Sequence, residues 1–180
     1  MSHKQGFYTN EKYSKNGIRL VRITDLQNPN LDYDSMPYVE INKKLIDDFK
    51  VNVGDFLFAR SGVIGRFGIV TKDIPCIFAS YIIKFKFNEK ILLNYFLGFF
   101  LQTNSILKQF NMIKQGSSNI NINAENIKSM KVITPPLLEQ QKIATILSNV
   151  DSLIDSTVQV ITHSKKVKTG LMQKLLTRGI

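Results

Sequence analysis

The sequence has little of what builds a disulfide framework or a zinc site. One cysteine, Cys76, and two histidines are present among 180 residues. A single cysteine excludes disulfides within the chain and a zinc-binding cysteine cluster, and it favours a reducing compartment. His3 and His163 are isolated in the sequence, so we interpret both as surface side chains.

Long hydrophobic runs are missing as well. The most apolar stretch, residues 91–101, is interrupted by Asn94 and is too short to cross a bilayer. The first residues, Met-Ser-His-Lys-Gln-Gly, lack the apolar core of a signal peptide. These two features predict a cytoplasmic protein with no membrane partner.

Positive charge is in excess. The chain has 24 Lys and Arg against 14 Asp and Glu, a formal net charge of +10. A surface of this sign favours a polyanionic partner such as nucleic acid. Hydrophobic residues make up 43% and charged residues 21%, which indicates an ordinary folded domain of this length, with room for one appended element.

Residues 1–136 are expected to form one domain of mixed strands and helices, in the α/β class in its mixed α+β form. The stretch 17–24, "GIRLVRIT", alternates apolar and basic residues with the period of a half-buried strand. The other expected elements are a strand at 38–42, a helical turn at 43–49, a glycine-rich hairpin at 53–71, a strand at 76–87, a helical region capped by Asn88 that continues through Leu107 and ends at Gly116, and a strand at 127–134.

Residues 137–180 are expected to form a long helix. Pro135 and Pro136 end the preceding strand, and proline suits the first turn of a helix because its missing N–H needs no partner there. The helix is expected from about Leu138 to Leu176, roughly 55–60 Å at 1.5 Å per residue, and Gly170 is a candidate break. Apolar positions at steps of three and four indicate a coiled-coil partner interface; it comprises Ile143, Ile146, Val150, Leu153, Val160 and Val167.

The bend of the expected hairpin offers the first candidate contacts with nucleic acid. Arg60, Ser61 and Arg66 flank glycines that let a backbone approach a groove closely. Arginine can donate two hydrogen bonds to guanine or hold a phosphate. The alternative is that Gly62, Gly65 and Gly68 only shape a turn and the arginines are solvated.

Two further polar segments are candidate contact loops. The stretch "IKQGSSNIN" and a segment near the start of the chain supply polar and basic side chains, and glutamine and asparagine can read adenine. The alternative for the first segment is a polar loop that orders its own backbone. The candidates are Lys114, Gln115, Ser117, Ser118, Asn119 and Asn121 in the first segment, and Tyr13, Lys15 and Asn16 in the second.

Three other classes of function are weighed against DNA reading. The sequence does not support an enzymatic function. Its glycines form neither a dinucleotide-binding fingerprint nor a phosphate-binding loop, and no cluster of carboxylates suggests a Mg²⁺ site. An RNA-binding KH module is suggested by "GVIG", although β-rich flanks surround it. A non-specific nucleic-acid binding module or a coiled-coil adaptor without sequence reading is the remaining alternative.

Four segments in succession resemble the specificity (S) subunit of type I restriction-modification enzymes. They are "VGDFLFARSGVIGRFGIV", "QGSSNINI", "PPLLEQQKIATILSNVDSLID" and "GLMQKLLTRG". The resemblance implies a target recognition domain followed by a conserved spacer helix. A full subunit of this family carries two of each in one chain, whereas this sequence has one of each, so the resemblance implies a half-length form.

The resemblance also implies function and partners. The chain would read one half of a bipartite target in double-stranded DNA, hold modification (methyltransferase) subunits and a restriction subunit in place, and form a homodimer through its helix. It would have no catalysis and bind no cofactor of its own. S-adenosylmethionine, ATP and Mg²⁺ are expected on the partner subunits.

Overall fold

The computed structural model of the chain describes residues 2–8, 13–61, 65–114 and 124–179. The chain separates into two compact units, Met1–Gln141 and Lys142–Ile180. We call the first the globular unit, and the first turn of the long C-terminal helix belongs to it. The division after residue 136 expected from the sequence concerns function and stays a prediction.

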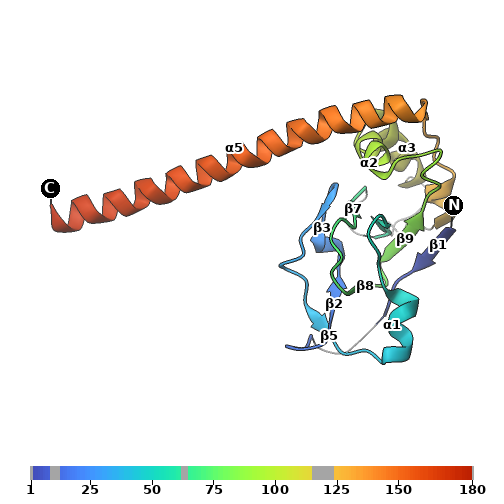
Figure 1. The fold of residues 1–180 in the computed structure, drawn as a ribbon, viewed down its shortest axis with the longest axis horizontal. Coiled ribbons are helices and arrows are strands. Elements are labelled where there is room, and N and C mark those ends of the chain that lie inside the picture. The colour runs from blue at the N-terminus through green and yellow to red at the C-terminus, as the bar shows by residue number, and fades with distance from the viewer. Residues whose placement is uncertain (1, 9–12, 62–64, 115–123, 180) are drawn as a thin grey trace. The chain divides into compact units, whose positions relative to one another are not determined.

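In the described part of the chain, the first half contains short strands with η1 and α1 among them, and the second half is helical (Figure 1). The strands are β1 (Ser2–Gln5), β2 (Ile18–Val21), β3 (Leu26–Gln27), β4 (Asn30–Leu31), β5 (Tyr38–Val39), β6 (Phe56–Ala59), β7 (Phe67–Ile69), β8 (Cys76–Phe78) and β9 (Ile82–Lys86). The helices are the 3-10 turn η1 (Ile23–Asp25) and the α-helices α1 (Lys43–Phe49), α2 (Asn94–Leu101), α3 (Asn104–Lys114), α4 (Ala124–Lys128) and α5 (Leu137–Arg178).

The strands form three sheets. The largest is antiparallel throughout, with the strand order β1-β9-β6-β7. In the second, of order β5-β2-β8, β2 pairs antiparallel with β5 and parallel with β8. The third is the hairpin of β3 and β4. This arrangement confirms the mixed α/β class, although the sequence analysis missed β1 and the β3–β4 hairpin.

Strand β6 is buried on both faces. Phe56 and Phe58 pack into a phenylalanine-rich cluster with residues of α2 and α3, whereas Leu57 and Ala59 pack into a second cluster on the other face. Because neighbouring side chains of a strand point to opposite faces, an unbroken apolar run such as "FLFA" suits a strand enclosed in this way. The strand therefore joins the two main cores of the globular unit.

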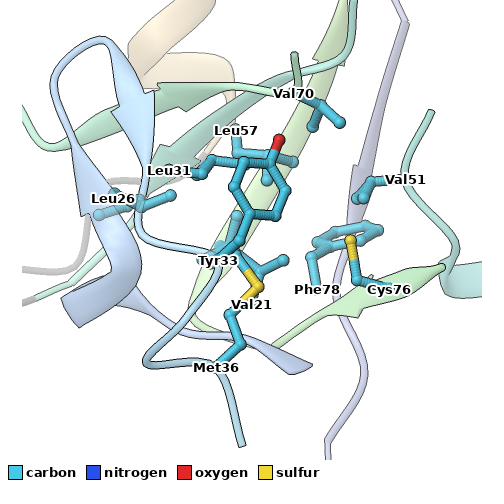
Figure 2. Close-up of a cluster of buried hydrophobic side chains, with 12 residues drawn as sticks. Val21, Leu26, Leu31, Tyr33, Met36, Val51, Leu57, Val70, Cys76 and Phe78 are labelled. Carbon is cyan, nitrogen blue, oxygen red and sulfur yellow. The ribbon is translucent and has the colours of Figure 1, made fainter. Parts of the chain in front are cut away.

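Tyr33 combines burial with two hydrogen bonds. Its side chain lies in the cluster of Val21, Leu57 and Phe78, with the hydroxyl oxygen directed toward Val70 (Figure 2). The residue is 5% exposed. The hydroxyl accepts hydrogen bonds from the backbone N–H groups of Thr71, at 3.0 Å, and Lys72, at 3.2 Å. It therefore pairs two backbone donors beside the core.

The strand expected at 76–87 is in fact two strands in different sheets. β8 pairs with β2, and β9 pairs with β1 and β6. A turn separates them, in which the Ile82 N–H donates to the Ala79 carbonyl at 2.9 Å. Apolar residues continue across this turn, so the apolar pattern of the sequence does not show where the first strand ends. Phe85 of β9 lies in the core and is 1% exposed.

The helix expected from Asn88 begins later. The Asn88 Oδ1 atom accepts from the Lys90 N–H at 3.1 Å, which makes a turn, and α2 starts only at Asn94. The helical region also divides into α2 and α3 near Thr103. Gly116, the expected end of this region, lies outside the described residues. The expected hairpin and the helical turn at 43–49 are confirmed as β6–β7 and α1, although Gly68 lies within β7 and outside the bend.

The prediction of a strand at 127–134 is wrong. The segment begins with the end of α4 and continues without a strand. Its Ile127, Met130 and Val132 side chains pack against the phenylalanine-rich cluster. The Gln109 amide bonds both backbone groups of Lys131, at 2.9 and 3.1 Å, so a side chain takes the place of a neighbouring strand.

The expected long helix is confirmed as α5, of 42 residues, and Pro136 lies directly before it. Gly170 was expected as a candidate break, but the helix continues through it without interruption. A glycine in a helix costs about 1 kcal/mol relative to alanine, which a helix of this length can absorb.

We predict that Tyr33→Phe lowers the free energy of unfolding by about 1–3 kcal/mol, because the Thr71 and Lys72 N–H groups lose their acceptor. Urea denaturation followed by circular dichroism measures this change. Tyr81→Phe is the matched control, since Tyr81 is 55% exposed. Equal unfolding midpoints for the two variants would contradict the prediction.

Candidate nucleic-acid interface

The hairpin of β6 and β7 positions three of the candidate contact residues. Arg60 and Ser61 directly follow β6, and Arg66 directly precedes β7. The Ala59 N–H donates to the Arg66 carbonyl at 2.9 Å, which closes the hairpin below the bend. All three candidates are partly exposed. Residues 62–64 lie outside the described residues, but Gly65 has φ +85°, which glycine adopts without strain.

The polar segment after β2 lies against the base of this hairpin. Arg66 donates from Nη1 to the Ile23 carbonyl at 3.4 Å. The Asn28 amide accepts from the Phe67 N–H at 2.8 Å and donates to the Gly65 carbonyl at 3.4 Å. The hairpin is therefore attached to η1 and to the β3–β4 hairpin by hydrogen bonds of both backbone and side chain.

Arg22 and Asp25 form a buried ion pair at the centre of this region. The Asp25 side chain is fully buried, and that of Arg22 is 29% exposed. Asp25 accepts from the Arg22 backbone N–H at 2.8 Å, from Nε at 3.1 Å and from Nη2 at 2.8 Å. Its Oδ1 atom also accepts from the Ser35 hydroxyl at 2.9 Å. These bonds compensate for the desolvation of the carboxylate.

The Arg22 guanidinium also reaches the segment that contains Tyr13. Its Cζ atom lies 5.8 Å from the centre of the Tyr13 ring, a cation–π distance. Hydrogen bonding to Asp25 raises the pKa of Arg22 above its ordinary value, so the stacked group stays charged. The Tyr13 side chain is itself 58% exposed. Tyr13, Arg22 and Arg66 are therefore linked through the 22–25 turn.

The other predicted contacts have different outcomes. Lys15 and Asn16 are exposed, and the Asn16 N–H donates to Ser14 Oγ at 3.2 Å. No contact between them and the hairpin is seen in the described ranges. Lys114 is the last residue of α3, and its side chain is not described. Five candidates lie outside the described residues: Gln115, Ser117, Ser118, Asn119 and Asn121.

Arg22 is the residue that sequence reasoning missed. The alternating pattern suggested a solvated side chain on a strand, whereas β2 ends at Val21 and Arg22 turns to Asp25. A basic and an acidic residue three positions apart at the end of a strand is the signal that could have found this pair. Arg19 has a different partner, since its Cζ atom lies 5.6 Å from the Tyr38 ring centre.

A second candidate surface runs along α5. The predicted interface positions Ile146, Val150, Leu153, Val160 and Val167 are between 47% and 68% exposed, and Ile143 is partly exposed. The neighbouring row of Leu147, Ile154, Val158 and Ile161 is between 38% and 54% exposed. Exposed apolar side chains in such numbers mark an interaction surface.

Metal and membrane sites were also sought in the described ranges. No group of three or more His, Cys, Asp or Glu side chains among those residues is arranged to hold a metal ion. None of the described helices combines the length and the apolar character needed to cross a membrane.

Comparison with protein-family models gives one match, to the type I restriction modification DNA specificity domain, over residues 2–163. The type I restriction enzyme MjaVIII specificity subunit of Methanocaldococcus jannaschii is 31% identical over 140 residues, which cover 77% of this chain and 31% of that protein. The EcoBI specificity subunit of Escherichia coli is 24% identical over 168 residues, covering 92% of this chain and 35% of that subunit.

Solved structures share the fold. The HsdS subunit from Thermoanaerobacter tengcongensis aligns with a TM-score of 0.62 and 18% identity, covering 88% of this chain and 42% of that one. The type I restriction-modification S subunit from M. genitalium aligns with a TM-score of 0.64 and 16% identity, covering 99% and 44%. The chain spans less than half the length of each of these relatives.

We predict that Asp25→Asn lowers the free energy of unfolding by about 3 kcal/mol, because it removes one partner of a buried ion pair and leaves the other uncompensated. Chemical denaturation of the purified chain measures the loss. The exposed carboxylate of Asp34 supplies the control, Asp34→Asn, for which little change is expected. A loss no larger than that of the control would show that the pair does not organise this region.

Proposed function

This chain belongs to the family of type I restriction modification DNA specificity domains, and on that premise we propose that it reads one half of a bipartite DNA target. The observation that carries the proposal is the match over residues 2–163, because this range contains both the arginine-flanked hairpin and the first part of α5. The fold shared with solved S subunits supports it.

Base reading is assigned to the β6–β7 hairpin in this proposal. Arg60 and Arg66 extend from two strands held together by backbone pairing, so their positions are preorganised before DNA arrives. A guanidinium can donate two parallel hydrogen bonds to the O6 and N7 atoms of guanine. Ser61 and the polar residues of the 114–121 segment would add contacts to bases, and Tyr13, Lys15 and Asn16 contacts to the backbone.

The net charge of +10 provides the sequence-independent part of binding. Neutralising phosphates gives an affinity for DNA that falls steeply as the salt concentration rises. Contacts with base edges give selectivity between DNA sequences. The family match favours sequence reading over a non-specific nucleic-acid binding module or a coiled-coil adaptor. Measuring affinity and selectivity separately distinguishes these functions.

Catalysis is assigned to other subunits. In this proposal the chain is non-catalytic and holds the modification subunits and the restriction subunit on the DNA. S-adenosylmethionine, ATP and Mg²⁺ would be bound by those partners. The chain would act in the cytoplasm, where its DNA and its partner subunits are found together.

Homodimerisation is proposed through α5. A helix of 42 residues spans roughly 60 Å, which exceeds the 34–36 Å of one DNA turn. Its first half carries Glu139, Asp151 and Asp155 against the single basic residue Lys142, and its second half carries Lys165, Lys166, Lys168, Lys174 and Arg178. Antiparallel pairing of two copies would set the acidic half against the basic half, bury both apolar stripes, and suit an interrupted palindrome.

We predict that Arg66→Ala weakens binding to the preferred duplex by about 1–3 kcal/mol while binding to unrelated duplex changes little. Arg66→Lys is the matched variant, because it keeps the charge and loses the bidentate geometry. Competition binding at two salt concentrations measures both affinities. If Arg66→Lys retained full selectivity, Arg66 would hold a phosphate and would not read a base.

We predict that Val160→Asp converts a dimeric chain to a monomer, because the substitution places a charge in the apolar stripe of α5. Val160 is 65% exposed in the single chain, so its own folding tolerates the change. Gln159→Asp adds the same charge at the neighbouring exposed position outside the stripe. Light scattering gives the mass of each variant, and monomers or dimers in both cases would contradict the proposed interface.

A further inference from the structure

Gln140 is a polar side chain in a fully buried position. It is 0% exposed, although it lies in the first turn of α5, where most neighbours are exposed. A buried amide is costly unless its donors and acceptor are all paired. Gln140 belongs to the globular unit, so the partners of its amide are expected there.

The amide of Gln140 makes three hydrogen bonds to backbone atoms. Its Oε1 atom accepts from the Leu93 N–H at 2.9 Å. Its Nε2 atom donates to the Ile91 carbonyl and to the Pro135 carbonyl, each at 2.8 Å. Both amide hydrogens and the amide oxygen are therefore used, and each bond ends on a backbone group.

These bonds join the start of α5 to the start of α2. Leu93 is the N-cap residue of α2, and its own N–H lies at the helix start, where the helix supplies no acceptor; the Gln140 side chain supplies one. At the start of α5, the Pro136 carbonyl accepts from the Gln140 N–H at 3.1 Å. The backbone of Gln140 is therefore bonded within α5, and its side chain is bonded at the start of α2.

Helix α2 is in turn packed closely on the base-reading hairpin. A Cβ atom added at Gly98 would lie 2.8 Å from Cε2 of Phe67, so the helix approaches β7 as closely as a glycine allows. Phe67 directly follows Arg66 in the chain. A continuous series of buried contacts thus runs from the start of α5 through Gln140 and α2 to the hairpin.

We propose that Gln140 is a positioning residue that locks the start of α5 to the base-reading hairpin and thereby sets the spacer length between the two half-sites. This inference rests on the proposed function. In a dimer joined by α5, a tilt of about 5° at the start of a helix roughly 60 Å long moves its far end by about 5 Å. One base pair adds about 3.4 Å along DNA, so a loosened joint admits neighbouring spacers.

The test compares Gln140→Ala with Gln141→Ala, since Gln141 is the adjacent residue and is exposed. Each full-length chain selects duplexes from a randomised pool, and sequencing gives both the half-site bases and the spacer between them. We expect one spacer length for the wild type and for Gln141→Ala. For Gln140→Ala we expect the same half-site bases with neighbouring spacers accepted severalfold more often.

The outcomes separate this proposal from the one on which it rests. Enriched half-sites with a single spacer in both variants would overturn the role of Gln140 and leave the proposed function intact. A wild-type chain that enriches no half-site, either alone or with modification subunits added, would overturn both. These two results cannot be confused, because one concerns bases and the other concerns the distance between them.

Folding is checked by hydrogen exchange and by a second variant. Gln140→Leu keeps a side chain of similar size and removes all three hydrogen bonds, so the same change of spacer is expected for it. Exchange in both variants should accelerate at Leu93, which loses its acceptor, and stay slow in the buried strand β6. Loss of protection throughout the chain in both variants would make Gln140 a folding residue and overturn its positioning role.

Discussion

The burial of β6 on both faces is the constraint on which the rest of the globular unit depends. Phe56 and Phe58 supply one core and Leu57 and Ala59 the other, so the strand cannot move without disturbing both. Such interiors are close-packed and transmit strain. The residues that follow the strand, Arg60 and Ser61, therefore emerge from a segment that is enclosed on both faces. This suits the base-reading role proposed for these two residues.

Polar side chains then attach the surrounding loops to this frame. The Arg22–Asp25 pair holds the turn after β2, Asn28 joins that turn to the hairpin, and Gln140 joins the start of α2 to the start of α5. Each is buried or partly buried, and each bonds backbone groups. Because a half-paired buried group is strongly unfavourable, these bonds select one arrangement of the loops. The unit would thus present a preorganised surface to DNA.

The sequence predicted the features that depend on local patterns. Heptad spacing predicted α5, and glycines between two apolar runs predicted the β6–β7 hairpin. Prediction from the sequence failed where tertiary contacts determine the secondary structure. The apolar run of residues 76–87 was read as one strand because a turn at Ala79 has no composition signal. Residues 127–134 were read as a strand, but their apolar side chains pack on the phenylalanine-rich cluster and the Gln109 side chain bonds the Lys131 backbone.

The candidate contacts Arg60 and Arg66 came from arginines beside glycines, a pattern that is visible in one short stretch of sequence. Their role in DNA binding stays a prediction. The roles of Arg22 and Gln140 were not visible there. Gln140 bonds residues that lie 47 and 49 positions away, and no local pattern encodes such a contact. The residue types alone suggested a solvated strand position and an exposed helix position.

Selection of randomised duplex DNA by the purified wild-type chain, at two salt concentrations and with its mass recorded in solution, tests the central claim most directly. The account predicts an enriched interrupted palindrome that persists at the higher salt concentration and a mass equal to that of a dimer. Enrichment only after modification subunits are added would place the reading in the assembled complex. Binding that falls with salt and enriches no sequence under either condition would contradict sequence recognition by this chain.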